Sequence, residues 1–170
     1  MPITTSTVLK STSAQTLGAL SSVLKKGADH AASLKIPEDV FLGFRLYPDM
    51  FPLTRQVQIA CDQVTRGSAR LAGADLPSFP DTETTFAQLQ DRITKANAFC
   101  QAQDSAAIDK RTDTTISVPI GPGQEMSVTC GQFLLGMILP NLYFHSATAY
   151  DILRHNGVVL GKRDFLRPAG

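Results

Sequence analysis

Apolar residues recur at every third or fourth position through four long stretches of the chain. This spacing is typical of helices that bury one face and expose the other. The stretches cover residues 5–33, 52–72, 83–103 and 131–156. They predict an all-α chain built on four long helices, and with 170 residues the chain is long enough for a single well-packed domain over residues 1–170.

The helical spacing is interrupted between Thr114 and Thr129. Ile116, Val118 and Ile120 alternate with polar residues in this segment, and a Gly-Pro-Gly turn at residues 121–123 follows them. Alternation with a period of two next to a turn is typical of a β-hairpin. Since a lone hairpin is only marginally stable in water, we expect it to pack on the helices or to cover one end of them, as an insertion between the third and fourth long helices.

Two polar side chains lie within the fourth helix, one turn apart on one face, at Asn141 and His145 beside Pro140. The second helix carries Gln58 and Asp62, also one turn apart, next to its buried stripe. A catalytic interpretation makes His145 a general acid or base, oriented by Asn141 and made more basic by Asp62. The structural alternative is a buried histidine whose ring nitrogens bond Gln58 and a backbone carbonyl.

The third helix offers no comparable candidate. We expect Asp81 or Thr82 to cap its start. Its charged and amide side chains are predicted to be solvated and without function, namely Gln90, Asp91, Arg92 and Lys95.

Composition and charge narrow the function classes. Sixteen basic residues against 15 acidic ones give a formal net charge of +1, and no Lys/Arg cluster is interleaved with aromatic residues, so we expect no nucleic-acid partner. No apolar run reaches the ~18 residues of a membrane span, and the N-terminus has no signal-peptide pattern, so we expect a cytoplasmic protein without a membrane partner. The three cysteines have no metal-ligand spacing and are predicted to be small buried hydrophobes, with a catalytic thiol as the alternative: Cys61, Cys100 and Cys130.

Three passages of the sequence are similar to a known family. They are Arg45-Leu-Tyr-Pro-Asp-Met-Phe-Pro-Leu53, the segment from Pro140 to Gly157 that begins Pro-Asn-Leu-Tyr-Phe-His, and Gly161-Lys-Arg-Asp-Phe-Leu166. With the four helices and the insertion, the chain resembles an uncharacterised "domain of unknown function" family in the DinB/YfiT-like superfamily of proposed metalloenzymes. The resemblance implies a four-helix bundle, commonly a homodimer, with a cavity at one end.

The resemblance also implies a place for a metal ion, and the sequence departs from it there. Metal-binding members of the superfamily take one histidine from the second helix and two, four residues apart, from the last. His145 is similar to the second of that last pair, but Asn141 stands where the first belongs, and Gln58 or Asp62 stands on the second helix. Because neutral amides bind Zn²⁺ poorly, we expect no cofactor, with a divalent metal held by His145 and Asp62 as the alternative.

The sequence thus predicts a bundle that binds a small organic molecule. The first hypothesis is an enzyme that performs acid-base chemistry, or weakly metal-assisted chemistry, in an internal cavity around His145. The second hypothesis is a non-catalytic ligand carrier or dimerisation module, whose polar core residues set the register of the helices. An enzyme predicts a cavity of roughly 300 Å³ or more that His145 faces.

Overall fold

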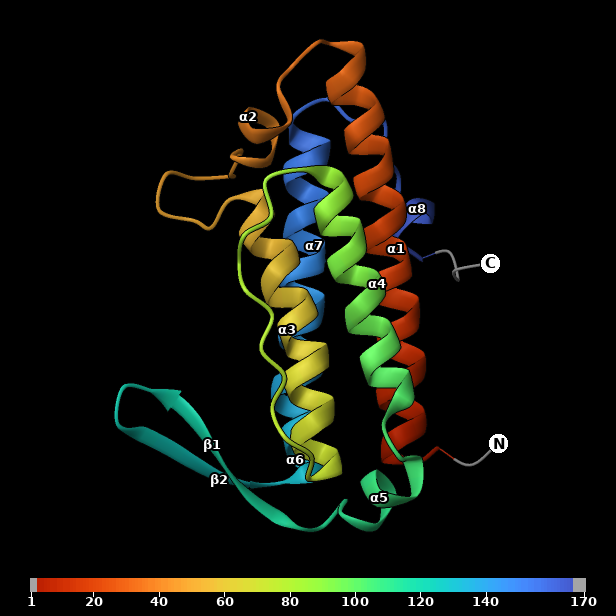
Figure 1. The fold of residues 1–170 in the computed structure, drawn as a ribbon, viewed down its shortest axis with the longest axis vertical. Helices are drawn as coiled ribbons and strands as arrows, with labels where there is room; N and C mark the ends of the chain where they lie inside the picture. The colour runs from red at the N-terminus through yellow and green to blue at the C-terminus, as the bar shows by residue number, and fades with distance from the viewer. Residues whose placement is uncertain (1–2, 167–170) are drawn as a thin grey trace.

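Four long helices lie side by side along the length of the molecule, whose residues 3–166 are described by a computed structural model (Figure 1). They are α1 (Thr5–Ser33), α3 (Leu53–Ala72), α4 (Phe86–Ala102) and α7 (Leu139–His155). Each of α1 and α3 packs against both α4 and α7. The prediction of a mostly helical chain is therefore confirmed.

Short elements connect the long helices or follow them. Between α1 and α3 lies α2 (Glu38–Leu42), and α5 (Ser105–Lys110) follows α4. After the last long helix, α8 (Lys162–Leu166) folds back on α1. The ring of Phe165 lies 5.9 Å from that of Tyr150, centroid to centroid.

The third long helix begins later than its sequence pattern predicts. Its cap is Thr85, whose hydroxyl accepts a hydrogen bond from the backbone N–H of Gln88, while the Gln88 side chain bonds the backbone N–H of Thr85. This reciprocal capping box satisfies two N–H groups that a helix start leaves open. The predicted caps Asp81 and Thr82 are wrong, because this part of the chain remains extended and the Asp81 carboxylate bonds arginines instead.

The segment before α7 contains a π turn. A one-turn helix α6 (Cys130–Phe133) leads into η1 (Leu134–Ile138), and the N–H of Leu139 donates to the carbonyl of Leu134, five residues back. Pro140, which has no N–H to donate, follows at once at the start of α7. The helix thus accommodates Pro140 by a widened turn, a feature frequent at functional sites.

The predicted β-hairpin is present. Its strands β1 (Thr115–Gly121) and β2 (Gln124–Thr129) pair antiparallel, and Thr115 lies opposite Thr129. Figure 1 shows the hairpin leaving the end of the molecule where α6 begins and reaching out beside α3. Val118 is buried, so one strand contributes to the apolar core.

The hydrophobic core also contains the three cysteines as free, buried thiols, as predicted. In the described part of the chain, no helix has the length and the apolar character that a membrane span requires.

Candidate functional site

A groove with a volume of about 340 Å³ lies between α3 and the hairpin. We call it the hairpin groove. Its α3 side is formed by residues one turn apart on a single helix face, Asp62, Arg66 and Arg70, with Gln63 and Gly67 beside them. Across the groove lie side chains of β1, α6, η1 and α7: Val118, Pro119, Ile120, Phe133, Met137 and Asn141.

Gly67 allows the π turn to approach α3 at the bottom of this groove. A Cβ atom built on Gly67 would lie 2.8 Å from Cδ1 and 2.9 Å from Cγ1 of Ile138. Real carbon atoms do not pack that closely, so any side chain here would push η1 away from α3. Since Met137 of η1 lines the groove, Gly67 helps to set the groove's width.

Asn141 has one hydrogen-bonding group engaged and one free. Its amide nitrogen donates to the carbonyl of Met137 at 2.8 Å, one turn earlier. Its amide oxygen has no partner among the described residues, and the side chain lines the groove. Asn141 therefore presents a fixed hydrogen-bond acceptor there.

The two arginines of the groove have no counter-ion among the described residues. Neither Arg66 nor Arg70 makes an ion pair or a side-chain hydrogen bond with a described residue. Burial lowers the pKa of Arg70, and the positive charge of Arg66 lowers it further. The Arg70 guanidinium nevertheless remains charged at neutral pH.

Arg92 is buried, contrary to the prediction that it is solvated: its residue is only 3% exposed. Its two terminal nitrogens bond three carboxylates, those of Asp62 at 2.8 Å, Asp81 at 2.9 Å and Glu83 at 2.9 Å. One of these nitrogens also donates to the carbonyl of Pro80. We call Arg92 and these three acidic residues the Arg92 cluster.

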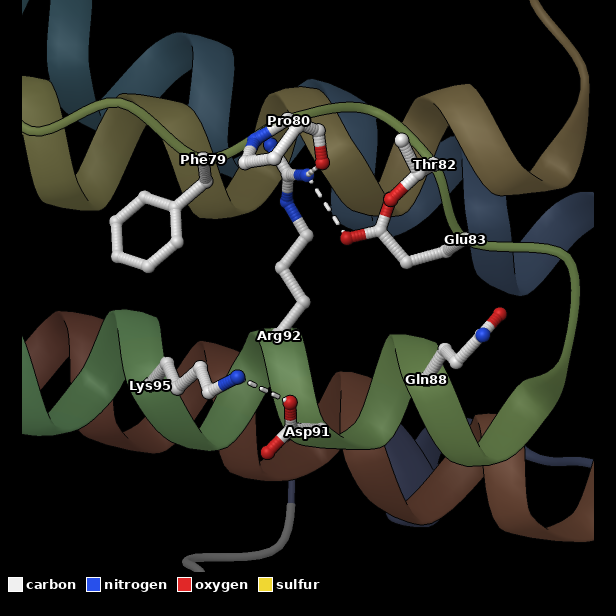
Figure 2. A pocket seen from close by; sticks show the side chains of 8 residues that line it. All are labelled: Phe79, Pro80, Thr82, Glu83, Gln88, Asp91, Arg92 and Lys95. Carbon is white, nitrogen blue, oxygen red and sulfur yellow. Dashed lines mark hydrogen bonds and ion pairs between the residues drawn. The ribbon is translucent and has the colours of Figure 1, made fainter.

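The cluster fastens the extended connector between α3 and α4 to both helices. Figure 2 shows the Arg92 side chain rising from α4 to Pro80 and Glu83 of the connector. A small pocket of about 190 Å³ opens beside it, between the connector and α4. Burial alone would raise the pKa of Glu83, but hydrogen bonds from Arg92 and Gln58 outweigh that effect and hold the pKa below its usual value.

The predicted residues Gln58 and Asp62 belong to this network. The Gln58 side chain donates a hydrogen bond to Glu83 at 2.8 Å, and the Asp62 carboxylate accepts one from Arg92. Neither bonds His145. Asp62 also lines the hairpin groove together with Asn141, so these two predicted residues do share one cavity.

His145 is buried and bonds α3 through a different glutamine. Its Nδ1 lies 2.7 Å from the side-chain oxygen of Gln56. The Gln56 amide nitrogen donates to the carbonyl of Phe51, which fixes the orientation of the amide. Because an amide oxygen only accepts, Nδ1 carries the proton in neutral His145 and Nε2 keeps its lone pair. Nε2 has no partner among the described residues.

The surroundings of His145 favour this neutral form. Burial lowers the pKa of the imidazole, and the positive charge of Arg55 lowers it further. His145 lines neither the hairpin groove nor the pocket beside Arg92. The hairpin groove is therefore not the cavity predicted around His145, whose imidazole bonds α3 outside it.

The residues do not fit the metal centre that the resemblance suggests at His145 and Asp62. Within residues 3–166, no group of three or more His, Cys, Asp or Glu side chains lies close enough to hold an ion. The Asp62 carboxylate is already held by Arg92, and His145 is held by Gln56. A structural or catalytic divalent ion such as Zn²⁺ needs three or four protein ligands whose donor atoms converge on the ion.

Sequence reasoning missed Arg92, Gln56 and the groove arginines. A signal for Arg92 was present, because it stands three residues after Leu89 and four before Ala96 on the buried stripe of α4. Gln56 likewise stands four residues before Ala60 on the buried stripe of α3.

Comparisons with known proteins identify a matching family and a similar solved structure. The family described as "Domain of unknown function (DUF1993)" matches residues 7–166. Among solved structures, the chain is similar to a DinB family member protein from Shewanella denitrificans, with 39% sequence identity and a TM-score of 0.85. The match covers 94% of this chain and 90% of that one. No curated protein matches the chain.

Proposed function

Since the chain belongs to the DUF1993 family, whose description names no activity, we propose its function from the geometry. It is a small-molecule-binding helical protein that takes its ligand in the hairpin groove. Its four long helices correspond to a DinB-like four-helix bundle, and the hairpin is an insertion between the third and fourth of them.

The groove is the observation that carries this proposal. Its volume of about 340 Å³ falls within the usual range for ligand sites, roughly 300–1,000 Å³. It combines an apolar wall with a few fixed polar groups, the arrangement that binds and orients small molecules. Two residues that the sequence nominates independently, Asp62 and Asn141, line it.

A fragment screen by NMR tests this function. Isotope-labelled protein is titrated with small acids, amines and neutral compounds, and we expect binding shifts at Ile120, Met137 and Asn141. Gln63→Trp fills the groove without changing its charge and should abolish these shifts. Gln101→Trp, on an exposed position of α4, is the matched control and should preserve them. Fragments that bind Gln63→Trp as well as the parent protein would refute the proposal.

A second candidate function, acid-base catalysis by His145, is favoured by one observation. The chain Phe51, Gln56, His145 fixes the tautomer in which Nε2 is an available base. Diethyl pyrocarbonate acylates unprotonated, accessible imidazole nitrogen, and mass spectrometry locates the modified histidine. We expect His145 to be modified in the folded protein, more slowly than exposed His155 because its residue is only 8% exposed. Complete protection of His145 would leave it a purely structural residue.

We also propose that the protein is a homodimer that joins through the outer face of α7. No Asp, Glu, Lys or Arg occurs between Glu125 and Asp151. The exposed side of η1 and α7 in this range is apolar, with Leu135 64%, Tyr143 43% and Phe144 59% exposed. A helix with apolar residues on both faces is typically covered on both. A second copy supplies an identical uncharged stripe, as a two-fold interface requires.

Light scattering after size exclusion tests the dimer. The parent protein is expected at twice the mass of the chain, and Phe144→Glu at the mass of one chain. Val159→Glu introduces the same charge at another exposed apolar residue and should leave the dimer intact. A parent protein that elutes as a monomer at every concentration would refute the interface.

A further inference from the structure

We propose that the hairpin groove binds an amphipathic anion, with an oxyanion head group on Arg66 and Arg70 and an apolar body under the hairpin. The proposal rests on the binding function proposed above and names the class of ligand. The head group is a carboxylate or a phosphate ester, which share the planar, bidentate recognition that guanidinium groups provide.

The first argument is the uncompensated positive charge. Arg66 and Arg70 stand one helical turn apart on the same face of α3, where like charges repel. Neither has a carboxylate or any other side-chain partner among the described residues. Arg70 is half-buried, so it is partly removed from the water that would solvate it. A bound oxyanion would offset this charge, in full for a dianionic phosphate ester and by half for a carboxylate.

The second argument is the position of the nearest carboxylate. Asp62 stands one turn before Arg66 and also lines the groove, so it is the natural intrahelical partner for that arginine. Its carboxylate instead bonds buried Arg92 at 2.8 Å, on the α4 side of the helix. Arg92 thereby offsets the negative charge of Asp62, the acidic side chain among the described residues that line the groove.

The third argument is the apolar character of the opposite wall. Phe133 and Val118 are each 5% exposed and form a packed apolar surface. Ile120 is 52% exposed at the groove's edge, where a ligand's apolar body would cover it. The volume of about 340 Å³ limits this body to a short chain or a single ring.

Matched six-carbon ligands test the proposal in the intact chain. Hexanoate, hexyl phosphate and hexanol are titrated by isothermal calorimetry at low salt, with NMR shifts at Ile120 to locate binding. We expect at least one of the two anions to bind at least tenfold more tightly than hexanol, and its affinity to fall as salt is added. Whichever anion binds more tightly identifies the head group.

Arginine variants test the assignment of the charges. Arg66→Gln and Arg70→Gln should each weaken binding of the preferred anion at least fivefold, without changing the affinity for hexanol. Arg154→Gln removes an exposed arginine of α7 that also lacks a described partner, and it should change affinity less than twofold. Thermal unfolding of each variant verifies that the fold is retained.

The outcomes separate this inference from the function on which it rests. If hexanol binds the groove as tightly as both anions, or if both arginine variants bind normally, the anionic ligand is refuted and the binding function stands. If neither anion binds while neutral fragments shift the NMR signals of Ile120, the anionic ligand is likewise refuted and the binding function stands. If no compound of any charge shifts Ile120, both proposals fall together.

Discussion

Replacing Arg92 by methionine tests whether a single buried cation holds the connector between α3 and α4. Methionine keeps most of the length of the side chain and removes its charge. Asp62 and Glu83 then lose their cationic partner, while Asp81 keeps its ion pair with Arg55. Breaking a buried ion pair by removing one partner costs about 3–5 kcal/mol, because the other charge is left uncompensated.

The exposure of the three carboxylates places the loss at the lower end of that range. The side chains of Asp81 and Asp62 are 40% and 27% exposed, so water screens them once Arg92 is gone. The side chain of Glu83 is only 11% exposed, so water cannot take the place of Arg92 around its carboxylate. We therefore expect the variant to lose about 3 kcal/mol of unfolding free energy, or about 6–12 °C in Tm for a chain of this size.

Urea unfolding followed by circular dichroism measures the change, at constant m-value. Lys95→Met, one turn further along α4 on an exposed position, is the control and should change stability by less than about 0.5 kcal/mol. Arg92→Met/Glu83→Gln removes both partners and should recover much of the loss, because no buried charge remains. If the double variant is as unstable as the single one, the loss comes from packing and not from charge.

The pH dependence of the same variants checks the sign. The pKa of Glu83 is lowered in the folded protein, so its contribution is present above its ordinary pKa of 4.5 and is lost as the pH falls through the lowered value. In Arg92→Met, burial acts without the opposing cation, so protonation of Glu83 favours the folded state. The stability gap between the two proteins should therefore narrow on acidification. A gap that widens would contradict the electrostatic account.

Three further predictions concern other parts of the fold. Gly67→Ala should destabilise the protein by about 1–3 kcal/mol despite the better helix propensity of alanine, because its Cβ would overlap Ile138; thermal unfolding measures this. Gln56→Glu should raise the pKa of His145, which burial now lowers, because a carboxylate favours the imidazolium; the imidazole shifts in an NMR titration report it. Ellman's reagent should react with the native protein only at its rate of unfolding, because burial raises the pKa of all three thiols, Cys61, Cys100 and Cys130.

The parts of the fold that sequence predicted well are those encoded by neighbouring residues. The first helix has its predicted bounds, Thr5–Ser33, and the hairpin lies where the alternation of apolar and polar residues predicts it. Both signals depend only on which side of a single element each residue faces. The start of α4 was misplaced because Asp81 resembles a cap by composition, while its real partners are arginines on other elements.

The candidate site was harder because its contacts join distant segments. The structural interpretation paired His145 with Gln58, but residues 56 and 58 differ by about 200° around a helix, so they face opposite sides. Gln56 faces α7 and bonds His145, while Gln58 faces the connector and bonds Glu83. The phase of the buried stripe distinguishes them, since Gln56 is in register with Ala60, but the hydrogen-bond partner itself depends on how the helices pack.

Asp62 links the stability of the fold to the charge of the groove. It lies where α3 faces both the connector and the hairpin. Two arginines are candidate partners for its carboxylate: Arg92 of α4 and Arg66, one turn further along α3. Arg92 is buried and already shared by two carboxylates of the connector, so the additional contact with Asp62 satisfies a desolvated charge. Arg66 is exposed to water and gains little from a surface ion pair. The preference of Asp62 for Arg92 therefore follows from the burial of Arg92. While Asp62 bonds Arg92, the positive charges of Arg66 and Arg70 in the groove are not compensated by this carboxylate.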